Sequence, residues 1–212
     1  MKINNRFLII VFVLLFMFTL TSCIEVYQHI GKNKNGTIHI FTKLSVSKMI
    51  MELGNSFSDN PEEIDYDEML GDFSSEDLSM YESLNPVINK INTEFEFGYS
   101  IAFDIDKKDK NYKNHILEND IYFMPLFDDN EITIRMNSNA DNESIDNTAK
   151  DFLISSKYRI TISKSIIDPI NEIVLEYSDE VISIIPDDLG DSYLIEMPMD
   201  SILQNNAVLT IR

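Results

Sequence analysis

The chain has 212 residues, and its 36 acidic side chains outnumber 17 basic ones, which gives a formal net charge of −19 at pH 7. A charge of this sign repels phosphate groups, so we expect no nucleic-acid partner and no electrostatic attraction to anionic lipid headgroups. The single cysteine excludes a disulfide within the chain.

The first 22 residues have the pattern of a secretion signal. Lys2 and Arg6 precede an uncharged stretch whose apolar part ends at Phe18. A membrane-spanning helix needs about 20 apolar residues, so this shorter stretch is more typical of a cleaved signal peptide. We expect residues 1–22 to be removed and residues 23–212 to form a single domain, since this length can bury a core without disulfides.

The stretch Leu20-Thr21-Ser22-Cys23 resembles the lipobox of bacterial lipoprotein precursors, in which an aliphatic and two small residues precede an obligatory cysteine. The resemblance implies that Cys23 carries a lipid thioether, with acyl chains such as palmitate, and begins the mature protein. Each buried methylene contributes about 0.8 kcal/mol, so two or three acyl chains would hold the domain at an envelope membrane. The alternatives are an ordinary signal peptide or an uncleaved anchor with an incidental cysteine.

Directly after the lipobox, two alternating β-branched and aromatic runs flank an Asn-Gly pair, which predicts a β-hairpin. A three-residue loop at 34–36, with its glycine in the left-handed conformation, pairs Ile30 with Ile40 and Val26 with Leu44. One face of the hairpin is then apolar and the other polar. The polar face carries Glu25, Tyr27, His29, His39 and Lys43.

Residues 45–92 are predicted to be helical, in short pieces. Asn60-Pro61 and Ser75 offer helix starts, and a third helix is expected to begin at Asn85-Pro86. The segment from Asp59 to Glu82 holds ten acidic residues and no basic one. Such a run is typical of a solvated face, and the alternatives are a docking surface for a basic partner or loosely held divalent cations.

Apolar side chains occupy every odd position from Phe95 to Ile105, which indicates a long strand with one buried face. We interpret this aromatic stripe as core, and a pocket for an apolar ligand is the alternative. Residues 110–119, which include His115, are predicted to form a polar loop. A second hairpin is expected over 121–136, followed by an acidic loop over 137–150.

The rest of the chain is predicted to be rich in strands. They are expected at 158–162, 173–175, 181–185, 193–197 and 208–211. The predicted fold class is therefore α+β, a mostly antiparallel sheet with a few short helices packed on one face.

The order of these features is similar to that of the LppM-like domains of small bacterial envelope lipoproteins. The shared pattern is a lipobox, a hairpin with an Asn-Gly turn, a helical middle, a long alternating strand and a strand-rich tail. The long acidic helical segment departs from it. The resemblance implies a lipid-anchored α+β envelope protein without an assigned reaction, and it transfers no functional residue other than Cys23.

Few residues indicate chemistry. His29 and His39 share the polar hairpin face, where an acid such as Glu25 would be needed to complete a metal site. Asn137, Asn139 and Asp141 start like a calcium loop, but the glycine and the glutamate that the loop requires are missing, and the stretch from Asp104 to Asp109 departs from the pattern earlier.

No Gly-rich phosphate loop or nucleophile elbow is present. We therefore expect no enzyme activity, cofactor or metal, and Cys23 as the one functional residue. The favoured function is a non-enzymatic structural or protein-interaction domain, anchored by lipid in the bacterial cell envelope with an envelope protein as partner. The alternative is a carrier of an apolar ligand or calcium.

Overall fold

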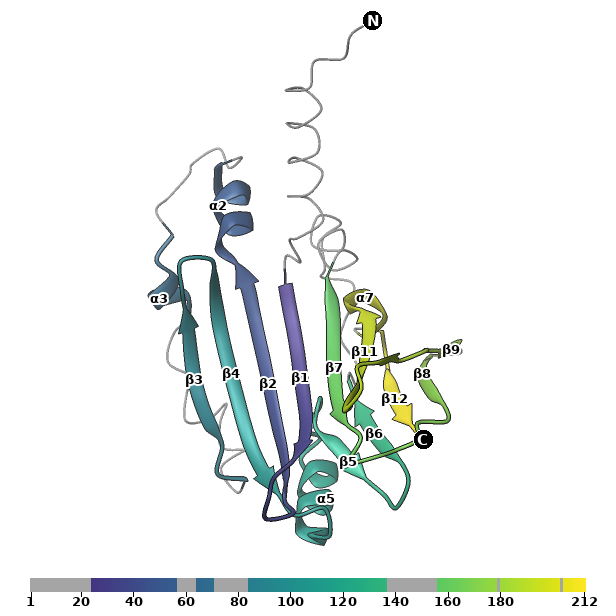
Figure 1. The fold of residues 1–212 in the computed structure, drawn as a ribbon. Coiled ribbons are helices and arrows are strands. Elements are labelled where there is room, and N and C mark those ends of the chain that lie inside the picture. The colour runs from purple at the N-terminus through teal and green to yellow at the C-terminus, as the bar shows by residue number, and fades with distance from the viewer. Residues whose placement is uncertain (1–23, 57–63, 71–83, 137–155, 179, 203) are drawn as a thin grey trace, which may run out of the picture.

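The computed structural model describes residues 24–56, 64–70, 84–136, 156–178, 180–202 and 204–212. The predicted signal, Cys23, the loop at 137–150 and most of the acidic segment lie outside these ranges. Within them the chain forms two β-sheets with a few short helices (Figure 1). None of the described helices is long and apolar enough to cross a membrane.

The larger sheet has seven strands in the order β10-β11-β7-β1-β2-β4-β3. Its strands are β1 (Ile24–Lys32), β2 (Ile38–Ser47), β3 (Val87–Asn92), β4 (Glu96–Ile105), β7 (Lys157–Ser163), β10 (Asp187–Asp188) and β11 (Ser192–Pro198). The smaller sheet has the order β5-β6-β12-β8-β9. Its strands are β5 (Pro125–Phe127), β6 (Ile132–Arg135), β8 (Ile173–Tyr177), β9 (Glu180–Ser183) and β12 (Val208–Ile211). The helices are α2 (Lys48–Ser56), α3 (Tyr66–Leu70), α5 (Lys110–Glu118) and α7 (Met199–Ile202).

The first hairpin has the predicted register. Ile30 pairs with Ile40 and Val26 with Leu44, and Gly36 has a φ of 92°, a conformation that glycine adopts without a steric penalty. Ile30 and Ile40 are fully buried, whereas Leu44 is 48% exposed. The apolar face of the hairpin is therefore covered at the turn and open near the end of β2.

The predicted long strand is β4, with Phe97, Phe103 and Ile105 buried and Phe95 exposed just before the strand. The prediction of a helix after Pro86 is wrong, because residues 87–92 form β3 and pair antiparallel with β4. Their β-branched side chains suit a strand, and β4 has a free edge whose backbone groups need partners.

Among the residues that the structure describes, all strand pairs are antiparallel except one, the parallel pair of β1 and β7. Glu25 is aligned with Lys157, and Ile30 with Ile162. A parallel neighbour needs a long crossover connection, and here the chain builds β2 to β6 before it returns to the free edge of β1. The prediction of a mostly antiparallel sheet therefore needs this correction at its centre.

The core lies between the two sheets. Side chains from one face of β1, β2, β4, β7 and β11 pack with the smaller sheet, which contributes Ile134, Leu175 and Leu209 at no more than 1% exposure. The rings of Phe123 and Tyr158 meet edge to face with centroids 5.8 Å apart. We call this side of the larger sheet the core face.

One polar side chain, Gln28, is fully buried on the core face. Its amide nitrogen donates to Phe123 O at 2.8 Å and to Thr42 Oγ1 at 3.1 Å. Its amide oxygen accepts a hydrogen bond from Tyr158 Oη at 3.1 Å. Because both ends of the amide have partners, Gln28 links β1 to β2, to β7 and to the segment before β5 without leaving a buried polar group unpaired.

Residues 110–118 form helix α5, so the prediction of a polar loop here is wrong. The Asp109 carboxylate caps the helix by accepting a hydrogen bond from Asn111 N at 2.8 Å. Tyr112 and Ile116, one turn apart, are buried in the core. Apart from these two residues and the exposed Leu117 the helix is polar, so its stability depends on the core that Tyr112 and Ile116 contact.

Candidate functional site

The face of the larger sheet opposite the core is polar, and we call it the polar face. Pairing places Glu25 opposite Lys157, Tyr27 opposite Arg159, and His39 opposite Asp104. Three rows of side chains cross it, from the end at which β1 begins to the end at which β1 turns into β2. They are a row of charges, a row around Tyr27 and a row around His39.

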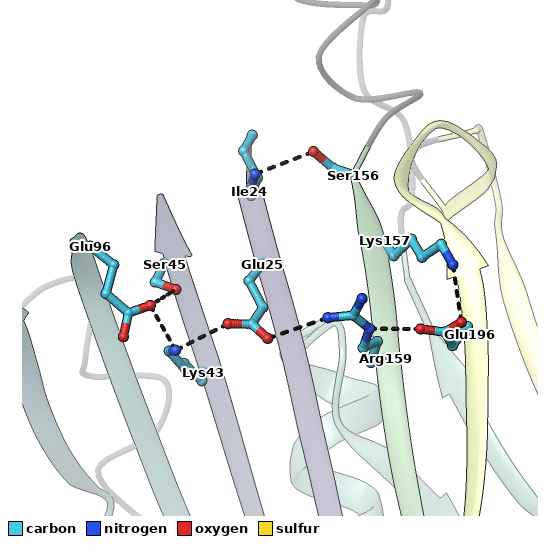
Figure 2. Close-up of polar contacts among 9 residues, drawn as sticks. All are labelled: Ile24, Glu25, Lys43, Ser45, Glu96, Ser156, Lys157, Arg159 and Glu196. Atoms are coloured by element: carbon cyan, nitrogen blue, oxygen red, sulfur yellow. Dashed lines mark hydrogen bonds and ion pairs between the residues drawn. The ribbon is translucent and has the colours of Figure 1, made fainter. Parts of the chain in front are cut away.

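The charged row crosses five strands, β4, β2, β1, β7 and β11 (Figure 2). Acidic and basic groups alternate along it without a break. We call it the charge row, and its members are Glu96, Lys43, Glu25, Arg159, Glu196 and Lys157. Its three acids and three bases cancel, so this surface is locally neutral in a chain of net charge −19.

Lys43 organises the half of the charge row on β4, β2 and β1. Its Nζ lies 2.7 Å from Glu96 Oε2 and 3.1 Å from Glu25 Oε2. Glu96 Oε2 also accepts a hydrogen bond from Ser45 Oγ at 2.7 Å. The lysine therefore joins two strands that both neighbour its own.

Arg159 organises the other half. Its NH1 lies 3.5 Å from Glu25 Oε1, and its Nε lies 2.7 Å from Glu196 Oε1. Lys157 Nζ ends the row, 3.0 Å from Glu196 Oε2. Glu25 thus accepts from β2 with one oxygen and faces β7 with the other, which makes it the centre of the row.

The environment keeps members of the row ionised. Burial disfavours the charge on Glu96, but hydrogen bonds from Lys43 and Ser45 outweigh it and lower the pKa of Glu96. Hydrogen bonds from Arg159 and Lys157 lower the pKa of Glu196. Burial also disfavours the charged form of Lys43, yet its bonds to two glutamates raise its pKa. A general acid or base needs a pKa near the working pH, which these groups lack.

The middle row joins Tyr27 and His29 on β1 to Thr161 on β7. Thr161 Oγ1 lies 2.7 Å from Tyr27 Oη and 2.9 Å from His29 Nδ1. The ring of Tyr27 also meets that of Phe41, with centroids 6.4 Å apart. Burial, and after it the electrostatic interaction with His39, lower the pKa of His29 below its ordinary value of 6.5, which favours the neutral ring.

The row nearest the β1–β2 turn is built on Asp104. Its Oδ1 lies 2.7 Å from His39 Nδ1 and accepts a hydrogen bond from Asn33 Nδ2 at 3.0 Å. These contacts, His39 first, lower the pKa of Asp104. A hollow of about 290 Å³ is lined by His29 and His39 together with residues of β7 and β11.

The two histidines do share the polar face as predicted, but each has its own partner. Glu25, the acid that would complete a metal site with them, binds Lys43 and Arg159 instead. In the part of the chain that the structure describes, no group of three or more histidine, cysteine, aspartate or glutamate side chains is placed to hold a metal ion.

The acids of the 104–109 stretch serve the local fold. Asp104 binds His39, the Asp106 carboxylate accepts from Lys108 N at 2.9 Å, and Asp109 caps α5. His115 lies on α5, and its ring nitrogen is 3.2 Å from Asn119 Nδ2. The calcium-like stretch at 137–141 lies outside the described residues, as does Cys23.

Seven described residues of the acidic segment, 64–70, contain α3. The Asp65 carboxylate caps this helix by accepting hydrogen bonds from the backbone nitrogens of Asp67 and Glu68, both at 3.0 Å. The ring of Tyr66 packs on Phe97, with centroids 4.9 Å apart. The described part of the acidic segment is therefore packed against the core face of β4.

Comparison with known proteins does not identify a family for the chain. No protein-family model matches the chain, and no curated protein matches it. The chain is similar to the folded domain of LppM from Mycobacterium tuberculosis, solved by NMR, with 10% identity over 90% of each chain and a TM-score of 0.39. This similarity is weak, like the resemblance drawn from the sequence, and it shows neither the family nor a function.

Two of the six members of the charge row could be placed from the sequence. Alternation around the Asn-Gly turn places Glu25 and Lys43 on one face, and both were predicted there. Arg159 lies 134 residues from Glu25 in the chain. Its place in the row depends on the parallel pairing of β1 with β7, for which no local pattern exists.

Proposed function

We propose that the chain is a lipid-anchored lipoprotein of the bacterial cell envelope that works without catalysis, by presenting the polar face of its larger sheet to a protein partner. The anchor is proposed from the lipobox at residues 20–23, which directly precedes β1. The observation that carries the interaction role is the charge row, a neutral, ordered surface built from six paired charges.

The properties of the charge row favour binding over chemistry. Its side chains keep between 22% and 51% of their surface exposed, so they are accessible to a partner. Their ion pairs hold them in fixed positions, which lowers the entropy lost when a partner binds. Charge complementarity at such a surface selects the partner and its orientation more than it raises affinity.

The anchor is tested by mass spectrometry of the protein isolated from its own membranes. We expect Cys23 to be the first residue, acylated on sulfur, with residues 1–22 missing. A Cys23→Ser variant should leave the membrane fraction after a salt wash or accumulate with its leader uncleaved. A free thiol on Cys23, or an intact leader on the native protein, would refute the anchor.

The interaction role is tested by two matched charge reversals. Lys157→Glu changes an end of the charge row, and Lys113→Glu changes an exposed lysine of α5 that binds Asp128 at 2.7 Å. Chemical crosslinking in intact cells should give a defined adduct that Lys157→Glu removes and Lys113→Glu retains. Equal adducts in both variants, or turnover of a substrate in a panel of hydrolase assays, would contradict the proposal.

A further inference from the structure

Three exposed apolar side chains gather at the end of the larger sheet where β1 begins. Met49 and Leu53 of α2 are 62% and 56% exposed, and Phe95, between β3 and β4, is 72% exposed. Met49 and Leu53 are one helical turn apart and therefore share a side of α2. We call these three residues the apolar end patch.

The backbone holds the patch together. β2 runs antiparallel to β1, with Val46 paired to Ile24, and α2 follows β2 without a gap. Lys48 N, in the first turn of α2, donates a hydrogen bond to Phe95 O at 2.9 Å. Figure 1 shows that α2 extends beyond the strands at the end of the sheet where β1 starts, and that α5 lies at the opposite end.

Chain connectivity puts the proposed anchor at this same end. Cys23 precedes Ile24, the first residue of β1, and consecutive Cα atoms are about 3.8 Å apart. Phe95 precedes β4, two strands away from β1, and neighbouring strands are about 4.8 Å apart. A lipid on Cys23 would therefore hold this end of the sheet, and the patch with it, at the bilayer surface.

The composition of the patch indicates which kind of surface it contacts. Large apolar side chains at a membrane surface are stabilised by burial at the headgroup and acyl boundary, because their apolar area is removed from water. Glu52 and Glu94 are exposed beside the patch, and the whole chain is acidic. Electrostatics therefore disfavours an anionic surface, and apolar contact with zwitterionic lipid is the attraction that this end offers.

We propose that Met49, Leu53 and Phe95 insert into the surface of the lipid bilayer and so orient the anchored domain, with the strands of the larger sheet pointing away from the membrane. This inference rests on the proposed anchoring at Cys23. The lipid tethers the protein, and the patch sets its tilt.

The chain contains no tryptophan, so one introduced indole reports on one position. Phe95→Trp places it in the patch, and Leu117→Trp is the matched control on α5, where the native side chain is 42% exposed. Both full-length lipidated variants are reconstituted into phosphatidylcholine vesicles with brominated acyl chains and recovered by flotation. We expect Phe95→Trp to lose about half of its emission, since side chains at the interface lie about 5–10 Å deep, and Leu117→Trp to lose none.

A third variant adds Met49→Lys and Leu53→Lys to Phe95→Trp. It should still float, because the lipid is intact, but its quenching should fall to the level of Leu117→Trp. Flotation without quenching of Phe95→Trp would overturn the inference and leave the anchor standing. Failure of the lipid-bearing protein to float would overturn both. An indole that is shielded from aqueous acrylamide and is also not quenched by brominated lipid would show that protein, such as a second copy, covers the patch, which also overturns the inference.

Discussion

The two faces of the larger sheet are built from alternate residues of the same strands, yet their side chains are buried to different extents. On the core face Ile30, Ile40 and Ile160 are fully buried between the sheets. On the polar face the charge row remains partly exposed, with Lys43 at 22% and Lys157 at 51%. The core face packs on protein over most of its area, whereas the side chains of the charge row all contact water as well.

The two faces contribute different amounts to the stability of the fold. A fully buried aliphatic side chain contributes about 1.5–3 kcal/mol, whereas a partly exposed ion pair contributes about 0–1 kcal/mol. The core face therefore carries most of the folding free energy. The polar face can be specialised for a partner because its side chains change at little cost to the fold.

The largest expected effect on stability is that of Ile160→Ala, and the adjacent residue on the opposite face, Thr161, provides the comparison. Ile160→Ala should lower the free energy of unfolding by about 2–5 kcal/mol, because it leaves a cavity between the sheets. Thr161→Ala, on the polar face, removes the hydrogen bonds to Tyr27 and His29 and should cost about 1 kcal/mol. Urea denaturation followed by circular dichroism measures both, and equal losses would contradict the division between the faces.

Gly98 shows that even the polar face has a position that excludes a side chain. Its φ is 155°, and a Cβ there would lie 2.0 Å from Leu44 O and 2.7 Å from Ser45 Cα on β2. Gly98→Ala should cost at least about 1–3 kcal/mol, because the backbone of β2 must move.

Gly36→Ala is the control for Gly98→Ala. Gly36 also has a positive φ, of 92°, but the space around it is open. Its cost should be about 1 kcal/mol, from backbone strain alone. The same denaturation experiment compares the two, and a smaller loss for Gly98→Ala than for Gly36→Ala would refute the steric account.

Tyr158→Phe tests the buried polar contact on the core face. It removes the donor to Gln28 Oε1 and leaves a buried oxygen without this partner, which should cost about 1–3 kcal/mol. Burial raises the pKa of Tyr158, so its phenol stays protonated as that donor. Tyr193→Phe removes an exposed hydroxyl that donates to Asp168 at 2.6 Å and should change stability by less than about 0.5 kcal/mol. Melting temperatures that fall equally would contradict this.

The smallest effect is expected in the charge row. Arg159→Met should cost about 0–1 kcal/mol at pH 7, because both of its ion pairs are partly exposed. The pKa of Glu196 is lowered in the folded protein, so its contribution is present above its ordinary value of 4.5 and is lost as the pH falls through the lowered value.

The difference in stability between Arg159→Met and the native protein should therefore shrink below about pH 4.5. Denaturation curves at pH 7, 5 and 3.5 measure it. Lys113→Met, which removes the Lys113–Asp128 pair away from the row, serves as the control. A difference that grows on acidification would show that Glu196 is not held ionised by Arg159.

Local patterns in the sequence predicted the parts of the fold that depend on neighbours in the chain. The Asn-Gly turn and the alternation around it determine the register of β1 and β2, because one face of the hairpin has to be buried. The same period of two identified β4, the second hairpin with its antiparallel β5 and β6, and the strands of the last third. Two of the six members of the charge row, Glu25 and Lys43, followed from that register.

Local patterns failed where a distant partner decides the structure. Residues 87–92 are β-branched enough for a strand, but only the free edge of β4 makes them one. Residues 110–118 look like a polar loop until Tyr112 and Ile116 meet the core. In both cases the segment is too short to hold its conformation alone.

The sequence by itself predicted a lipobox at Cys23, and it determined the acidic charge, the first hairpin and the long strand, because these features depend on residues close together in the chain. Only the tertiary structure decided that β7 lies beside β1, that Arg159 completes the charge row, and that Met49, Leu53 and Phe95 gather where β1 begins. The physical reason is that contacts between segments far apart in the chain form only when burial of a shared core offsets the entropy lost in closing the intervening chain, and no local pattern records that balance.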